Sequence, residues 1–279
     1  MDKKVLFLDG FMIPTSKSFL DSLSPGVLPG RGVFETMRSY GGKIFLLEEH
    51  LSRLRRGLRL LSVKMPVSAE KIRKHLYLTL NANGLRDARL RLTVWEQKGN
   101  PRISIAALPY RPYPREKYEE GFKAVIADVR RNEKSKFSRI KSIHYLPLAI
   151  ALRRAEAKGN DETIFLNRRG FLCEGSRSNI FYVKDGVLLT PDLSCGCLDG
   201  VTRKIVFKIA RNLKIKYKEV CALPENLTCA DEAFLTNSLL EIMPLTFLQG
   251  VMIGKGRIGE ITSKLLSSYR SFVREKIYP

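Results

Sequence analysis

The sequence predicts an α+β fold that is organised in two domains. The chain has 279 residues, of which 44% are hydrophobic, so it can bury one large core or two medium ones. Strand-like and helix-like segments alternate through both halves of the chain. Three closely spaced prolines, Pro109, Pro112 and Pro114, interrupt this alternation in the manner of a linker. We therefore expect a small domain over residues 1–118 and a larger domain over residues 119–279.

The first half is predicted to combine strands with two amphipathic helices. Its expected strands are residues 5–8, 33–40, 44–46, 89–95 and 103–108. The pair Gly41-Gly42 forms a hairpin turn between the second and third of these strands. Leucines recur at three- and four-residue steps over residues 47–61, which predicts a helix with one apolar face. A second helix is expected to begin after Ser68, which is a favourable N-cap residue.

The second half is predicted to contain more strands than helices. Its expected strands are residues 122–127, 162–166, 178–183, 187–190 and 232–236. One helix is expected from about residue 146 to 158, shortly after Lys141. Another is expected to begin after Gly200, in the run Gly200-Val201-Thr202-Arg203.

The net charge of +21 does not by itself indicate a nucleic-acid-binding protein. The 49 lysines and arginines are spread along the whole chain, and no known nucleic-acid-binding motif accompanies them. We interpret them first as a solvated basic surface, and second as charges that attract an anionic cofactor and an anionic substrate. Binding of nucleic acid is a distant third interpretation.

Cysteine content and hydropathy indicate a soluble, cytoplasmic protein without a structural metal. Five cysteines are an odd number in a long chain, which favours reduced thiols over a disulfide scaffold. The pair Cys195-Gly196-Cys197 lacks the spacing of a zinc or thioredoxin-like motif, so we expect no bound metal. The start of the chain has only four consecutive apolar residues, Val5–Leu8, which is too short for a signal peptide or a membrane span.

Lys141 and Glu174 are the candidate catalytic residues. Most lysines are surface residues, but Lys141 has Ile140 and Ile143 around it and Tyr145 four residues later. A desolvated lysine has a lowered pKa, and its amine can then attack a carbonyl to form a Schiff base. Glu174 precedes Gly175-Ser176 at the expected entrance of a strand, where it is either a turn residue or a carboxylate against a cofactor ring nitrogen.

Three further segments are candidates for binding a phosphate group. Val201 and Thr202 follow Gly200 at a predicted helix start, where backbone N–H groups favour an anion. The polar run Thr236-Asn237-Ser238 ends an apolar strand, and Arg53 lies on a predicted helix. An ordinary helix cap and a surface arginine are the alternative interpretations.

Six motifs in this order resemble the class IV aminotransferases, which are the fold-type IV enzymes that use pyridoxal 5'-phosphate (PLP). The motifs are Gly32–Arg38, His50–Leu54, Lys141 with Tyr145-Leu146, Glu174–Phe181, Asp199–Arg203 and Leu235–Pro244. The family includes branched-chain aminotransferases, D-amino-acid aminotransferases and 4-amino-4-deoxychorismate lyases. The triplet Gly30-Arg31-Gly32 and the segment 23–29 depart from the usual family pattern.

The resemblance implies a role for each candidate residue. Lys141 would form the Schiff base and act as general acid and base, and Glu174 would pair with the pyridine nitrogen. Tyr145 would lie near the ring hydroxyl of the cofactor. The residues that would hold the phosphate are Arg53, Val201, Thr202 and Ser238, with Thr236 and Asn237 as further candidates.

The resemblance also implies the architecture and the partners. We expect a two-domain fold-type IV PLP enzyme, with a small α/β N-terminal domain and a larger barrel-like α/β C-terminal domain. It would be a homodimer with its active site near the subunit interface, and it would act on a small anionic amino compound.

The subfamily is predicted from a few substrate-side features. The segment 236–244 is more similar to the lyases than to branched-chain enzymes. Arg89 and Arg91 alternate on one predicted strand, so they share a face and could hold a dianionic substrate, although that face could equally be exposed to solvent. These features favour 4-amino-4-deoxychorismate lyase, with a branched-chain or D-amino-acid aminotransferase as the alternative. A catalytically silent basic binding protein on the same scaffold is a third possibility.

Overall fold

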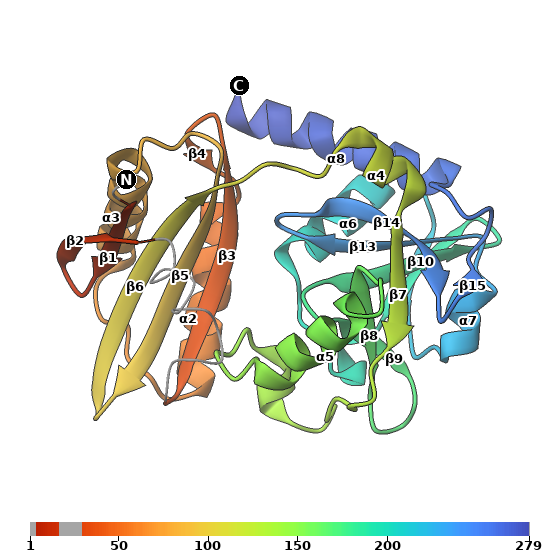
Figure 1. The fold of residues 1–279 in the computed structure, drawn as a ribbon, viewed down its shortest axis with the longest axis horizontal. Helices are drawn as coiled ribbons and strands as arrows, with labels where there is room; N and C mark the ends of the chain where they lie inside the picture. The colour runs from red at the N-terminus through yellow and green to blue at the C-terminus, as the bar shows by residue number, and fades with distance from the viewer. Residues whose placement is uncertain (1–3, 17–29, 279) are drawn as a thin grey trace. The chain divides into compact units, whose positions relative to one another are not determined.

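The computed structural model describes residues 4–16 and 30–278, which form two units that we describe separately (Figure 1). The first unit comprises the chain up to Arg111, the short segment Ile140–Leu146 and the end of the chain from Lys276. The second unit comprises Pro112–Arg139 and Pro147–Glu275. The segment 23–29, which departs from the family pattern, lies outside the described residues.

The first unit is built on an antiparallel sheet of six strands, counted over the described residues. In spatial order these are β2 (Phe11–Thr15), β1 (Lys4–Leu8), β6 (Asn100–Pro109), β5 (Ala88–Gln97), β3 (Gly32–Tyr40) and β4 (Lys43–Ile44). Side chains alternate between the two faces of a strand. On β3, therefore, Val33 and Met37 face the main core, whereas Phe34 and Thr36 face the opposite side.

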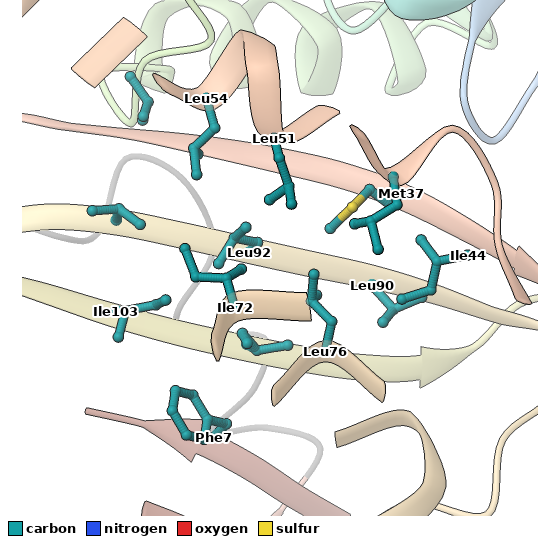
Figure 2. Packing of buried hydrophobic residues seen from close by; sticks show 14 of the residues in the cluster. Phe7, Met37, Ile44, Leu51, Leu54, Ile72, Leu76, Leu90, Leu92 and Ile103 are labelled. Carbon is teal, nitrogen blue, oxygen red and sulfur yellow. The ribbon is translucent and has the colours of Figure 1, made fainter. Parts of the chain in front are cut away.

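Helices α2 (Leu47–Leu60) and α3 (Ala69–Ala82) pack against one face of this sheet and form its main core (Figure 2). The predicted leucine stripe is confirmed, because Leu51 and Leu54 are each 1% exposed and point into the cluster. The predicted N-cap is confirmed as well. The Ser68 hydroxyl accepts a backbone N–H from the first turn of α3 at 3.3 Å.

The second unit contains a curled sheet with nine strands among the described residues. Its main path is β12 (Tyr217–Val220), β11 (Val187–Pro191), β10 (Asn179–Lys184), β13 (Glu232–Asn237), β14 (Glu241–Leu248), β7 (Phe122–Ile126), β8 (Glu162–Leu166) and β9 (Leu172–Gly175), and β15 (Val251–Met252) pairs with β14. The curl brings β9 back to the other end of the sheet, where the Leu172 N–H donates to the carbonyl of Ala222 at 2.7 Å. The predicted α+β, barrel-like architecture is confirmed.

Helices join and cover the strands of the second unit. They are α4 (Arg115–Glu120), α5 (Leu146–Glu156), α6 (Val201–Asn212), α7 (Pro224–Thr228) and α8 (Glu260–Ile277). The predicted domain boundary at about residue 118 falls within α4. In the part of the chain that the structure describes, no helix is both long enough and apolar enough to cross a membrane.

Four strands that the structure describes in the second unit were not predicted, namely β9, β12, β14 and β15, and two of them bear on the site or on the reason for the miss. Glu174 is not at the entrance of the strand that begins near residue 178, because it lies inside the short strand β9, opposite Phe165 of β8. Strand β9 has only four residues, which are too few to show an alternating hydrophobic pattern in the sequence. The strand β14 was not predicted because it contains Pro244, a residue that normally excludes a central strand.

Candidate active site

Lys141 lies on a short segment of the first unit that pairs with the beginning of β3. Its carbonyl accepts the N–H of Phe34 at 2.9 Å, and the Ile143 N–H donates to the carbonyl of Gly32 at 3.1 Å. The Lys141 side chain is partly buried, and its Nζ lies 4.7 Å from the centre of the Phe34 ring. This is a cation–π distance. The strand β3 therefore fixes both the backbone and the amine of Lys141.

Phe34 is the centre of a cluster that includes two other candidate residues. The ring of Tyr145 meets the Phe34 ring edge-to-face, with 6.1 Å between the ring centres. The Arg91 guanidinium carbon lies 5.3 Å from the Phe34 ring centre. Two cationic side chains, Arg91 and Lys141, thus face one buried ring. Their combined positive potential favours an anion in their neighbourhood.

Arg91 belongs to a row of arginines on the face of the sheet that carries Phe34. The register of β3 with β5 places Arg91 opposite Thr36 and Arg89 opposite Arg38. Between the two β5 arginines, Leu90 is fully buried on the helix side of the sheet. Arg89 and Arg91 therefore share a face, and Arg38 adds a third guanidinium that the sequence analysis did not select.

Arg53 forms a buried cluster with two residues whose pairing was not predicted. Its Nε and Nη2 donate to Oε1 and Oε2 of Glu35 at 2.8 and 2.6 Å. His50 Nδ1 lies 2.7 Å from the same Oε2, and Glu35 is 0% exposed. These bonds fix the plane of the Arg53 guanidinium and join helix α2 to strand β3.

The electrostatics of this cluster favour a charged glutamate and a neutral histidine. Burial alone would raise the pKa of Glu35, but the charge and hydrogen bonds of Arg53, together with His50, lower it from 4.5 to about 2. Burial lowers the pKa of His50 below 6.5, although Glu35 opposes this shift. The neutral imidazole therefore donates its Nδ1 hydrogen to the carboxylate.

Glu174 of the second unit is held by donors on both of its oxygens. Arg131 Nη2 lies 2.8 Å from Oε1, and the Leu198 N–H donates to Oε2 at 2.9 Å. The glutamate side chain is 8% exposed. The turn-residue interpretation of Glu174 is therefore wrong, since its carboxylate is part of a buried polar network.

Arg131 was noticed in the sequence only as one of many basic residues. Besides Glu174, its guanidinium donates to the carbonyls of Ser138 and Gly196, at 2.6 and 3.3 Å. Burial alone would lower the pKa of Arg131, but Glu174, together with Cys173 and Cys197, raises it above its usual value. Arg131 thus positions Glu174 and ties it to the loop that contains Gly196.

The start of α6 has the geometry of an anion-binding helix end. Gly200 is its N-cap residue, and among the residues that the structure describes no side chain caps the helix; Val201 and Thr202 are buried there. A Cβ atom on Gly200 would lie only 2.0 Å from Oδ1 of Asn179, so only glycine fits. The backbone N–H groups of the first turn are therefore available to an anionic group.

The residues of the polar run at the end of β13 have different roles. Within the described residues, the buried hydroxyl of Thr236 has no hydrogen-bond partner. By contrast, the Asn237 side chain holds a turn: Oδ1 accepts the N–H groups of Leu239 and Leu240, both at 2.8 Å, and Nδ2 donates to Arg177. A buried hydroxyl without a partner is unfavourable, so Thr236 fits an external polar ligand.

The predicted site residues fall into two sets, each described within its own unit. The first unit carries Arg53, Arg89, Arg91, Lys141 and Tyr145, and the second carries Glu174, Val201, Thr202, Thr236, Asn237 and Ser238. Over the described ranges, no three His, Cys, Asp or Glu side chains gather as a metal site would require.

One of the missed pairings had a signal in the sequence. Glu35 alternates with the apolar residues Val33 and Met37, which places a charged side chain on the core face of a strand. Such a charge needs a partner, and His50 and Arg53 are three residues apart on one face of a helix.

Comparisons with known proteins identify relatives over almost the whole chain. The model of the family described as amino-transferase class IV matches residues 32–247. The chain is 34% identical to an aminodeoxychorismate lyase of Bacillus subtilis, over 98% of this chain and 96% of that protein. It is 31% identical to a branched-chain-amino-acid aminotransferase of Pseudomonas aeruginosa, over 98% and 94%. A solved branched-chain amino acid aminotransferase from Thermobaculum terrenum, in its PLP form, superposes with a TM-score of 0.84, at 26% identity, over 99% of this chain and 95% of that one.

The substitution Glu35→Gln tests the buried cluster. We expect it to lower the free energy of unfolding by about 3 kcal/mol at pH 7, because a carboxyl group with a pKa lowered from 4.5 to about 2 stabilises the folded state. Urea unfolding followed by circular dichroism measures the change. The matched control is Glu96→Gln, which removes the exposed ion pair with Arg31 and should change stability by less than about 1 kcal/mol.

The loss of stability caused by Glu35→Gln is expected to depend on pH. Stabilisation by Glu35 is complete above its unfolded pKa near 4.5 and is lost as the pH falls toward 2. In a His50→Gln background, which removes the titrating imidazole, the effect of Glu35→Gln should shrink by roughly 1–2 kcal/mol between pH 7 and pH 3. An effect that does not change with pH would contradict the lowered pKa.

Proposed function

The chain belongs to the class IV aminotransferase family, and from this membership we propose that it is a 4-amino-4-deoxychorismate lyase, which releases pyruvate and forms p-aminobenzoate. The family consists of PLP-dependent enzymes, so the chain is an enzyme of this class and its cofactor is PLP. The observation that carries the lyase proposal is the row of Arg38, Arg89 and Arg91 on one face of the first unit's sheet. The lyase substrate carries two carboxylates, and arginines bind carboxylates in bidentate pairs.

The second candidate is an amino-acid aminotransferase, which transfers an amino group to a 2-keto acid. The observation that favours it is the number of branched-chain aminotransferases among the similar sequences and structures. A branched-chain or a D-amino acid would be the substrate. Both candidates need a proton removed from the substrate Cα, so the two activities diverge only after that step.

The residues of the second unit suit the phosphate and the ring nitrogen of PLP. The buried Thr236 hydroxyl and the first turn of α6 offer donors to a phosphate. Glu174 presents a buried carboxylate that its two donors hold in one orientation. The donors at Thr236 and at the start of α6 suit an anionic group, and the Glu174 carboxylate suits a protonated ring nitrogen.

When bound, PLP supplies an aldehyde that takes up an amine and a ring that withdraws electrons from the substrate Cα. Lys141 would hold the cofactor through its ε-amine and would move the proton at Cα as general base and acid. Glu174 would keep a proton on the ring nitrogen, and Tyr145 would lie near the ring hydroxyl. The remaining residues, Arg53, Val201, Thr202, Thr236 and Ser238, would hold the phosphate, while Asn237 shapes the turn that carries Ser238.

We also propose a homodimer that binds a small anionic amino substrate. Arg38, Arg89 and Arg91 would bind the substrate carboxylates, and Arg131 would position Glu174 without touching the substrate. In this proposal the residues that move protons are the same for both candidate activities. The arginine row is the part that would select a dianionic substrate.

Lys141→Ala tests the cofactor-binding amine. The purified wild-type protein should show a near-ultraviolet or visible absorbance band, and borohydride should fix the cofactor to the peptide that contains residue 141. The variant should lack both the band and the fixed label, whereas Lys136→Ala, a nearby exposed substitution, should keep them. Absorbance spectra and peptide mass spectrometry give the readout. A label at another lysine would contradict the role of Lys141.

Glu174→Gln tests the carboxylate against the ring nitrogen. The variant should still bind the cofactor, but turnover should fall on the order of 10²–10³-fold, because a preorganised charge that stabilises the transition state is lost. The substitution also removes the carboxylate that pairs with the Arg131 guanidinium, which could destabilise the fold. Circular dichroism must therefore show that the variant is folded. Glu156→Gln, on the exposed end of α5, is the control and should retain wild-type turnover. Unchanged turnover in Glu174→Gln would refute the assigned role.

A substrate panel separates the two candidate activities. The enzyme is incubated with aminodeoxychorismate, and separately with L-leucine, L-glutamate and D-alanine, each with a 2-keto acid acceptor. We expect p-aminobenzoate and pyruvate from the first incubation, detected by chromatography. Arg91→Met should raise KM for aminodeoxychorismate by at least about 10-fold, since a charge-assisted hydrogen bond to a carboxylate is lost. Keto acids without p-aminobenzoate would favour the aminotransferase instead.

A further inference from the structure

Two cysteine sulfur atoms lie side by side at one end of the second unit's sheet. The Cys195 thiol donates to the sulfur of Cys221, and the two Sγ atoms are 3.2 Å apart. A disulfide bond is about 2.0 Å long, so a movement of about 1 Å would bring the two sulfurs to bonding distance. Neither cysteine has a role in the proposed function.

The backbone holds the two cysteines in this arrangement. Cys195 ends a short 3-10 helix, Leu193–Cys195, that follows β11, and Cys221 directly follows β12. The strands β11 and β12 are parallel neighbours, so both cysteines leave the sheet at the same end. Just beyond the paired residues, the Asp192 N–H donates to the carbonyl of Val220 at 3.0 Å. The proximity of the sulfurs therefore follows from the strand register.

The two thiols differ in their access to solvent. Cys195 is 0% exposed, and burial raises the pKa of its thiol to about 12, with a further contribution from Cys221. Cys221, in contrast, is exposed. An oxidant in solution therefore meets Cys221 first, and the buried thiol is held at the position where a second thiol is needed.

We propose that Cys195 and Cys221 are a redox-sensitive thiol pair that a peroxide converts into a disulfide. In the first step the Cys221 sulfur attacks one oxygen of hydrogen peroxide, the O–O bond breaks, and the products are a sulfenic acid and water. In the second step the Cys195 sulfur attacks the Cys221 sulfur, the S–O bond breaks, and the oxygen leaves as water with the Cys195 proton. The two thiols together lose two protons and two electrons, and the peroxide is reduced to two waters.

The disulfide would restrain a loop that supports the proposed cofactor site. Cys195 begins the stretch that contains Leu198, whose N–H donates to Glu174, and that ends at Gly200, the N-cap of α6. The neighbouring carbonyl of Gly196 accepts a hydrogen bond from Arg131. A covalent bond at Cys195 therefore ties this loop to the end of β12.

The test is titration of the full-length, PLP-loaded protein with hydrogen peroxide, followed by digestion and mass spectrometry without reductant. We expect a cross-link between the tryptic peptides 185–203 and 219–255, with the loss of two hydrogens and full reversal by dithiothreitol. Because each peptide contains two cysteines, variants identify the pair. In peptide 185–203, Cys195→Ser should abolish the cross-link, whereas Cys197→Ser should leave it intact. Cys221→Ser should abolish the cross-link, and Cys229→Ser, which removes the other exposed cysteine of the same peptide, should leave it intact.

Hydrogen–deuterium exchange measures the effect on the loop independently of enzyme activity. Peroxide should slow amide exchange in the peptide 185–203 of the wild-type protein, and it should have no such effect in Cys221→Ser. Sulfinic or sulfonic acid at Cys221 without a cross-link, or a cross-link that survives in Cys221→Ser, would overturn the proposal. Unchanged exchange in the cross-linked protein would overturn the coupling to the loop. Failure of the proposed enzyme activity would leave these outcomes unaffected, since none of them depends on turnover.

Discussion

A buried carboxylate costs several kcal/mol unless donors surround it, and the second unit is organised around one such group, Glu174. Arg131 binds one oxygen of Glu174 and the Leu198 N–H binds the other. The Arg131 guanidinium also donates to the carbonyls of Ser138 and Gly196. The backbone N–H of Arg131 donates to the carbonyl of Leu166 in β8 at 2.8 Å. Arg131 therefore joins a strand through its backbone, and Ser138, the Gly196 loop and the Glu174 carboxylate through its guanidinium. This explains why Glu174 can keep a fixed orientation in a short strand with little local support.

The first unit uses the same chemistry for a different purpose. Glu35 is buried and held by Arg53 and His50, so that helix α2 is clamped to β3. The preceding residue, Phe34, points to the opposite face of the strand, where its ring contacts the Lys141 amine. Since neighbouring residues of a strand alternate in direction, anchoring Glu35 on one face also fixes Phe34 on the other. The clamp thus supports Lys141 indirectly, through Phe34.

Local patterns were sufficient to predict most of the elements, whereas long-range pairings were not. The leucine stripe of α2 and the Ser68 cap of α3 depend on residues within a few positions of each other, and both are present. Lys141 and Glu174 were identified as candidates through the order of the family motifs. The ion pair of Glu174 with Arg131 could not be predicted, because it joins residues that are distant in the sequence and neither lies in a periodic segment. Glu35 is an intermediate case, since its place among apolar strand residues indicated a buried charge but not its partner.

The arginine row places like charges side by side on one face of the first unit's sheet. Arg38 lies directly opposite Arg89 on neighbouring strands, and like charges in that arrangement repel. Stacking of the Arg38 guanidinium on the rings of Tyr40 and Tyr110, at 4.1 and 4.9 Å, offsets part of this cost. An anionic ligand would offset more of it, because two adjacent guanidiniums can share the charge of one carboxylate or hold two carboxylates side by side. In the proposed function, this charge pattern of β3 and β5 is the feature that would favour a substrate with negative charge away from its reacting Cα.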